Sequence, residues 1–190
     1  AGQSVLLIDG DLRRPSLHKL LNLDGTVGLT DVVIGRAGLS DVTQPIGRGN
    51  LHVLLSGQIP PNPSELLGSK RTETVLREAV DRYDMVIVDS PPLLPVTDAA
   101  VLSRLCGGAL MVVGSGTLTK PQLAASLASL EAVGAPLLGL VLNRARADGH
   151  GRYGYRHQNY YYYERQSDGA ELKVDQSVKR HSVRAVPVSP

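Results

Sequence analysis

A run of four apolar residues, 5–8, that stops at two aspartates places the strongest constraint on the fold of this chain. The run is continuously apolar, a pattern typical of a strand in a parallel sheet that helices cover on both faces. Asp9 and Asp11 follow it directly, in the sequence VLLIDGDLRRP. Because ligands of open α/β sheets bind at the carboxyl ends of the strands, the two acids predict a binding site. The alternative is that both aspartates only cap a turn around Gly10.

Further strand patterns alternate with helical patterns along the chain. We expect strands at 51–54, 85–88, 109–113 and 137–142, and helices at 69–82, 98–105 and 120–133. In the helix at 69–82, Val75, Leu76 and Val80 are expected to face the core. The alternation favours right-handed βαβ crossovers, and so predicts an α/β fold with a doubly wound, mostly parallel sheet.

The composition limits the number of domains and the kinds of partner. The 190 residues suit one ordinary domain with a tail, and we expect a domain at 1–147 and a flexible, tyrosine-rich tail at 148–190. Twenty Lys and Arg against eighteen Asp and Glu leave a formal charge of +2, too balanced to predict a nucleic-acid partner. A single cysteine excludes an intrachain disulfide. The sequence contains no apolar run of the ~20 residues that a membrane-spanning helix needs.

Polar side chains follow three of the predicted strands. Asp9 and Asp11 follow the first, Asp89 follows the run MVIV, and Asn143 follows the last strand. An acid at the end of an apolar strand is typical of the Walker B element, which holds Mg²⁺ directly or through water. In an Asp-x-Asp pair, one carboxylate can bind the metal while the other acts as a base toward a hydroxyl. The convergence of these strand ends therefore predicts a phosphoryl-transfer site.

Several segments together resemble the bacterial tyrosine autokinases of capsule and exopolysaccharide biosynthesis. LLIDGDLRRP resembles their Walker A′ element and VIVDSPP their Walker B element. PPNPSELLGS, YDMVIVDSPPLLPVTDA, GAPLLGLVLNR and a terminal tyrosine cluster also match, in that order. The resemblance covers roughly residues 5–163 and implies a P-loop NTPase fold of the deviant Walker type, with ATP and Mg²⁺ as cofactors.

The resemblance also implies a role for each residue of the site. Asp9 would be the base that helps deprotonate a tyrosine, Asp11 a magnesium ligand, and Asp89 a magnesium ligand through water. Asn143 would contact the adenine.

Six of the seven tyrosines fall within eleven residues near the end of the chain. By the resemblance they are the phosphoacceptors, modified by a neighbouring subunit: Tyr153, Tyr155, Tyr160, Tyr161, Tyr162 and Tyr163. Tyrosines on a polar tail can enter another molecule's active site, whereas tyrosines in a core cannot. The alternative is an aromatic patch that packs on a partner.

One element of the family pattern is missing from these residues. No G-x-x-x-x-G-K-[ST] loop occurs in the 190 residues, and that loop cradles the phosphates of the nucleotide. The chain is either part of a complete kinase or a degenerate copy without nucleotide binding, and we favour the first. Either way, we expect the 190 residues alone to be inactive.

The resemblance implies partners and a location as well. Members of the family assemble into rings, and they sit at the cytoplasmic face of the membrane, fused to or paired with a chain-length-determinant membrane protein. Two other functions stay open: an ATPase switch of the partition or septum-positioning type, and a non-catalytic interaction module.

Overall fold

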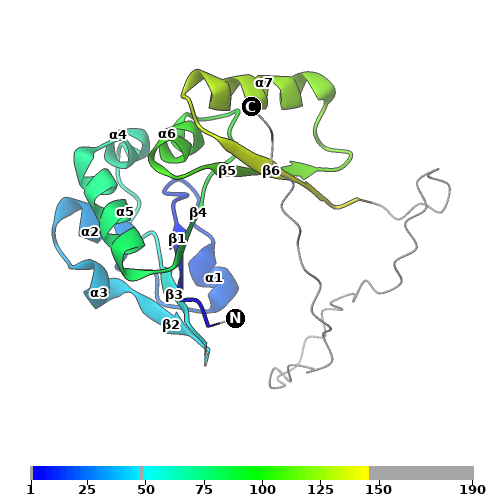
Figure 1. The fold of residues 1–190 in the computed structure, drawn as a ribbon. Coiled ribbons are helices and arrows are strands. Elements are labelled where there is room, and N and C mark those ends of the chain that lie inside the picture. The colour runs from blue at the N-terminus through cyan, green and yellow to red at the C-terminus, as the bar shows by residue number, and fades with distance from the viewer. Residues whose placement is uncertain (1, 48, 146–190) are drawn as a thin grey trace, which may run out of the picture. The chain divides into compact units, whose positions relative to one another are not determined.

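The computed structural model describes residues 2–47 and 49–145, and these form an α/β structure (Figure 1). They belong to a unit that spans Ala1–Ala147. The expected tail at 148–190, with its six tyrosines, lies outside the described residues. No helix among the residues described is long and apolar enough to cross a membrane.

Thirteen helices and strands follow one another along the described part of the chain. In order, they are β1 (Val5–Asp9), α1 (Leu17–Leu21), α2 (Leu29–Ile34), α3 (Leu39–Val42), β2 (Gln44–Ile46), β3 (Leu51–Leu54), α4 (Pro63–Leu67), α5 (Lys70–Arg82), β4 (Met85–Asp89), α6 (Asp98–Leu105), β5 (Ala109–Gly114), α7 (Lys120–Ala132) and β6 (Leu137–Asn143).

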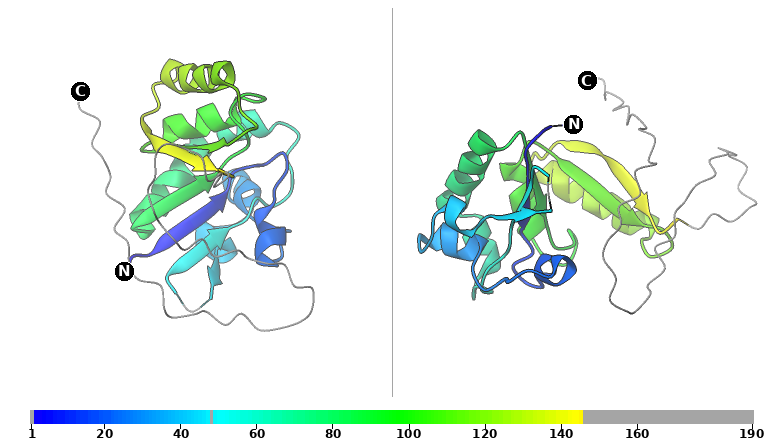
Figure 2. Two further views of the ribbon diagram at one scale, coloured as in Figure 1. Left: turned by 90° about the vertical axis from the view of Figure 1, so that its right-hand side faces the viewer. Right: turned by 90° about the horizontal axis from the view of Figure 1, so that it is seen from below.

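The strands pair in two groups. Four of them form a sheet in the order β2-β3-β1-β4, in which β1 runs parallel to both β3 and β4 and the edge strand β2 is antiparallel to β3. Strands β5 and β6 form a separate parallel pair. Figure 2 shows β1 and β4 side by side. The predicted α/β fold with mostly parallel strands is confirmed, although we expected the strands to share one sheet.

Helices cover both faces of the four-stranded sheet because β1 is apolar on both of its sides. Leu6 and Ile8 are fully buried against α2, α3, α5 and α6. Leu7 faces the opposite way and packs with Leu17 of α1 and with Val53 of β3. Figure 1 shows α1 on one side of β1 and α2, α3 and α5 on the other. Strand β1 therefore lies between β3 and β4 with helices packed on both of its faces, and the acidic residues follow at its carboxyl end.

Helix α5 differs from the expectation at one position. Val75 and Leu76 are buried as predicted, but Val80 is 63% exposed and Ala79 is fully buried instead. The apolar stripe of the helix runs through Thr72, Val75, Leu76 and Ala79, which follow the helical spacing of three and four residues. Val80 lies at the margin of this stripe, and the prediction that it faces the core was wrong.

Candidate functional site

The site is built where β1 and β4 end side by side. Asp9 and Asp89 are partners in the parallel register of the two strands, so both acids lie at the same edge of the sheet. The backbone N–H of Gly10 donates to the carbonyl oxygen of Asp89 over 2.8 Å and extends this pairing past the end of β1. The predicted convergence of Asp9 and Asp89 therefore corresponds to the observed pairing of their strands.

Asp9 is the buried member of the group. Its side chain is fully buried, and Oδ2 accepts a hydrogen bond from the backbone N–H of Leu17 over 3.2 Å. The other oxygen, Oδ1, is buried without a hydrogen-bond partner among the residues described. Loss of hydration raises the pKa of Asp9, and the charge of Asp89 adds to the effect. A buried carboxylate with one free oxygen and a raised pKa has the properties of a general base.

Asp11 and Asp89 are more accessible than Asp9. Asp11 is half-buried, and its Oδ1 accepts the backbone N–H groups of Arg13 and Arg14 over 3.1 and 3.0 Å, which fixes a tight turn. Its Oδ2 has no hydrogen bond within the described part of the chain. Asp89 is exposed, and partial loss of hydration together with the charge of Asp11 raises its pKa.

These carboxylates suit Mg²⁺ better than a metal ion whose ligands all come from protein side chains. Among residues 2–47 and 49–145, no group of three or more His, Cys, Asp or Glu could hold a metal ion by itself. Mg²⁺ is commonly bound by one or two carboxylates, and water and phosphate oxygens complete its shell. Asp11 and Asp89 both present accessible carboxylate oxygens, and a cation bound near them would offset the repulsion that raises the pKa of Asp89.

The structure does not bring Asn143 into the carboxylate group by strand pairing. Asn143 ends β6 in the second, two-stranded sheet, where its register partner is Gly114. Its side chain is exposed, and Oδ1 accepts the backbone N–H of Arg144 over 2.9 Å. The six predicted phosphoacceptor tyrosines lie outside the described residues. Their roles, and that of Asn143, stay predictions.

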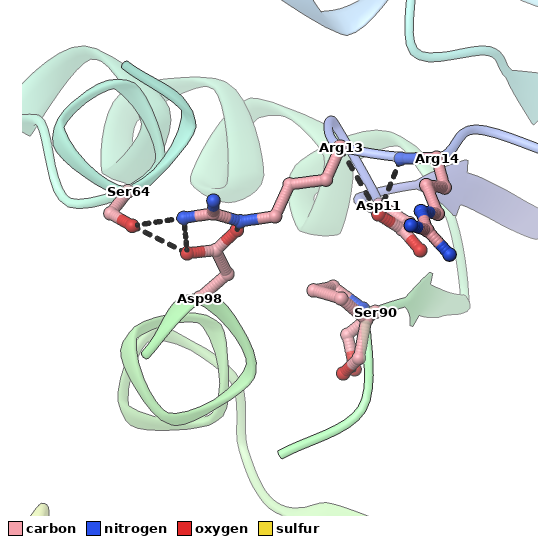
Figure 3. Close-up of polar contacts among 7 residues, drawn as sticks. Asp11, Arg13, Arg14, Ser64, Ser90 and Asp98 are labelled. Atoms are coloured by element: carbon pink, nitrogen blue, oxygen red, sulfur yellow. Dashed lines mark hydrogen bonds and ion pairs between the residues drawn. The ribbon is translucent and has the colours of Figure 1, made fainter. Parts of the chain in front are cut away.

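Ser64 and Asp98, which the sequence reasoning did not assign to the site, form a compact network with Arg13 beside it. The guanidinium of Arg13 forms an ion pair with the buried carboxylate of Asp98, and both contact the hydroxyl of Ser64 (Figure 3). These residues come from LRRP, NPSELL and VTDA. Each of these segments belongs to a motif that carries the family resemblance, and this was the available signal.

Comparison with solved structures identifies the class of fold. No family model matches the chain. One solved structure with this fold is the septum site-determining protein MinD of Pyrococcus horikoshii, in complex with Mg-ADP. It has a TM-score of 0.60 to this chain at 24% identity, and the matched region covers 74% of this chain and 58% of the MinD chain. At that identity the likeness concerns the fold alone. The fold is that of the P-loop NTPases of the MinD type.

Closer relatives are tyrosine kinases. The chain is 42% identical over 154 residues to the tyrosine-protein kinase YwqD of Bacillus subtilis, covering 81% of this chain and 65% of YwqD. It is 35% identical to the putative tyrosine-protein kinase CapB of Staphylococcus aureus, covering 86% of this chain and 68% of CapB. The kinase domain of the Escherichia coli tyrosine kinase Etk has a TM-score of 0.72 at 42% identity, covering 82% of this chain and 62% of that domain.

The chain belongs to the bacterial tyrosine-kinase family, and the resemblance drawn from its motifs is confirmed. It spans less than two thirds of the length of YwqD.

Proposed function

We propose that this chain is part of a protein-tyrosine autokinase that transfers the γ-phosphoryl group of ATP to tyrosines near its own carboxyl end. The observation that carries the proposal is the register pairing of Asp9 with Asp89, with Asp11 two residues further along the same loop. Three carboxylates at one sheet edge, in a member of a tyrosine-kinase family, match the needs of metal-assisted phosphoryl transfer.

The accessibility of each carboxylate suggests its role: the two accessible ones would bind the metal, and the buried one would accept a proton. Asp11 and the exposed Asp89 would hold Mg²⁺, Asp11 directly and Asp89 through water. When bound, the metal neutralises charge on the phosphates. Asp9, with its free Oδ1 and raised pKa, would accept the proton of the tyrosine hydroxyl. Because Asp9 is fully buried, this role requires the segment between Asp9 and Leu17 to move when the tyrosine enters.

In the proposed step, a bond forms between the tyrosine oxygen and the γ-phosphorus. The bond from that phosphorus to the bridging oxygen breaks and leaves ADP, while the hydroxyl proton passes to Asp9. Asn143, at the end of β6, would contact the adenine. The acceptors would be the tail tyrosines of a neighbouring copy: Tyr153, Tyr155 and Tyr160 to Tyr163.

The partners and the setting are proposed from the family as well. We propose that the protein self-associates into a ring, that it works at the cytoplasmic face of the membrane with a membrane-spanning partner, and that it regulates capsule or exopolysaccharide polymerisation and export. Since residues 1–190 contain no G-x-x-x-x-G-K-[ST] loop, we propose that they are inactive alone.

Replacement of single acids in the full-length protein tests the kinase chemistry. Asp9→Asn and Asp11→Asn should each abolish phosphotyrosine. Asp24→Asn should not, because within the described residues the Asp24 side chain accepts hydrogen bonds from Thr26, away from the carboxylate group. Asp41→Asn serves as a second control, since the Asp41 side chain accepts the backbone N–H of Gly38 at the start of α3.

The rival function is an ATPase switch of the partition or septum-positioning type, a class that includes proteins with this fold. A full-length protein that hydrolyses ATP, forms no phosphotyrosine and loses hydrolysis with Asp11→Asn would favour the switch. A protein that shows no dependence on nucleotide at all would favour a non-catalytic interaction module.

A further inference from the structure

Arg13 joins the loop that carries Asp11 to two distant helices. Its Nε lies 2.7 Å from Oδ2 of Asp98 and its Nη2 lies 3.1 Å from Oδ1, the two-point geometry in which a guanidinium binds a carboxylate most strongly. Arg13 and Asp98 are 85 residues apart in the chain. Asp98 is the first residue of α6, so this contact fastens the loop after β1 to the start of that helix.

Ser64 of α4 closes the network. Its hydroxyl donates to Oδ1 of Asp98 over 2.5 Å and accepts from Nη2 of Arg13 over 3.0 Å. The Asp98 side chain is fully buried, while that of Arg13 is 40% exposed. The hydrogen bonds from Arg13 and Ser64 hold the pKa of Asp98 below its usual value, so the carboxylate stays charged at neutral pH.

The same residue that is anchored by its side chain also orients Asp11 by its backbone. The N–H groups of Arg13 and Arg14 are the two donors to Oδ1 of Asp11. Those donors leave Oδ2 of Asp11 as the oxygen available to a ligand. Loosening the side chain of Arg13 would therefore loosen the backbone that sets the direction of this carboxylate.

We propose that Arg13, Asp98 and Ser64 form a positioning network that holds the Oδ2 oxygen of Asp11 in place for Mg²⁺. Arg13 is thus a positioning residue: it acts through Asp11 and has no contact of its own with the reacting atoms. The inference rests on the proposed function, since it takes Asp11 as a magnesium ligand.

The test is a Mg²⁺ titration of ATP binding to the full-length protein, followed with a fluorescent ATP analogue, alongside the thermal midpoint of each variant. Arg13→Gln and Asp98→Asn should each raise the half-saturating Mg²⁺ concentration about tenfold, the usual scale for losing a group that orients a metal ligand. Arg13→Lys keeps the charge but loses the two-point geometry, and should fall between wild type and Arg13→Gln.

A matched control separates positioning from ordinary stabilisation. Arg77 and Glu73 of α5 form an ion pair at the same 2.7 Å separation, but both are exposed. Arg77→Gln should leave the Mg²⁺ dependence unchanged. If Arg13→Gln lowers only the thermal midpoint and leaves the Mg²⁺ dependence where Arg77→Gln leaves it, the network is merely structural and the proposal is overturned.

A double variant tests whether Arg13 and Asp98 act together, and two milder variants are available if Asp98→Asn does not fold. Because Arg13 and Asp98 act as a unit, Arg13→Gln with Asp98→Asn should be no worse than the more damaging single change, and additive effects would contradict the proposal. Should Asp98→Asn fail to fold, Ser64→Ala and Arg13→Lys replace it, and unchanged Mg²⁺ dependence in both would overturn the proposal.

A wild-type protein with Arg13-dependent Mg²⁺–nucleotide binding and no phosphotyrosine would refute the kinase function and leave the positioning role standing.

Discussion

Gly10 approaches Asp89 so closely that no larger residue fits between the two strand ends. Its N–H donates to the carbonyl oxygen of Asp89 over 2.8 Å. A Cβ added at Gly10 would lie 2.6 Å from that oxygen and 2.8 Å from Cγ1 of Val88. The glycine between Asp9 and Asp11 is therefore a packing requirement, because it lets the two acids approach the end of β4.

Replacing Gly10 with alanine should lower the stability and distort the site together. The added methyl group meets backbone, which cannot rotate away, so we expect a loss of about 1–3 kcal/mol in the free energy of unfolding. Denaturant unfolding measures this loss. Gly107→Ala is the control, because an added Cβ there meets nothing within 4 Å. Equal stability of the two variants would contradict the close approach.

Asp9→Asn should raise the thermal midpoint at neutral pH in the absence of Mg²⁺ and nucleotide. The pKa of Asp9 is raised in the folded state above its ordinary value of 3.8, so folding disfavours the charged form. The destabilisation is complete above the folded-state pKa and disappears as the pH falls toward 3.8. The advantage of Asn should therefore shrink as the pH falls. Thermal melts from pH 8 to pH 4 check this, and a variant less stable than wild type throughout would contradict it.

Asp84→Asn should behave in the opposite way. Two hydrogen bonds from Ser4, at 2.7 and 2.8 Å, lower the pKa of Asp84 in the folded state. The stability that this carboxylate contributes is complete above its ordinary value of 3.8 and is lost as the pH falls through the depressed folded-state pKa. The cost of Asp84→Asn should thus be largest at neutral pH. Melts extended down to pH 2 measure it, and a cost that grows on acidification would contradict the assignment.

Asn143→Ala in the full-length protein should weaken ATP binding without affecting the fold. The side chain is exposed, and its hydrogen bond is to the adjacent residue Arg144. If Asn143 contacts the adenine as proposed, loss of that hydrogen bond should raise the KM for ATP about 5- to 10-fold. Asn50→Ala is the control, since the Asn50 side chain bonds to the carbonyl of Gly2. Steady-state kinetics decide, and an unchanged KM would remove Asn143 from the nucleotide site.

The carboxylate pair was predictable because local pattern and topology agree on it. VLLID and MVIVD are continuously apolar and end in acid, and two such strands in a parallel sheet end at the same edge. The strand β2 was not predicted, since Pro45 interrupts its three-residue pattern. A proline fits there because β2 is an edge strand, and only the assembled sheet reveals which strand is at the edge.

The network around Arg13 lay beyond sequence reasoning for a different reason. Asp98 reads as an ordinary acidic start of a helix and Ser64 as an ordinary polar residue after a proline. Their chemistry follows from a contact that spans 85 residues of sequence, and no local period encodes such a contact. Because Asp98 is buried, its ion pair with Arg13 attaches the loop that carries Asp11 to the start of α6.

The central claim is tested most directly by mapping phosphorylated residues, by mass spectrometry, in the full-length protein after incubation with ATP and Mg²⁺. The account predicts phosphate on tyrosines of the 153–163 cluster in the wild type and none in Asp9→Asn. It also predicts that a copy with all six of those tyrosines changed to phenylalanine still phosphorylates the tail of an Asp9→Asn copy. ATP hydrolysis that depends on Asp11 but leaves every tyrosine unmodified would contradict the claim.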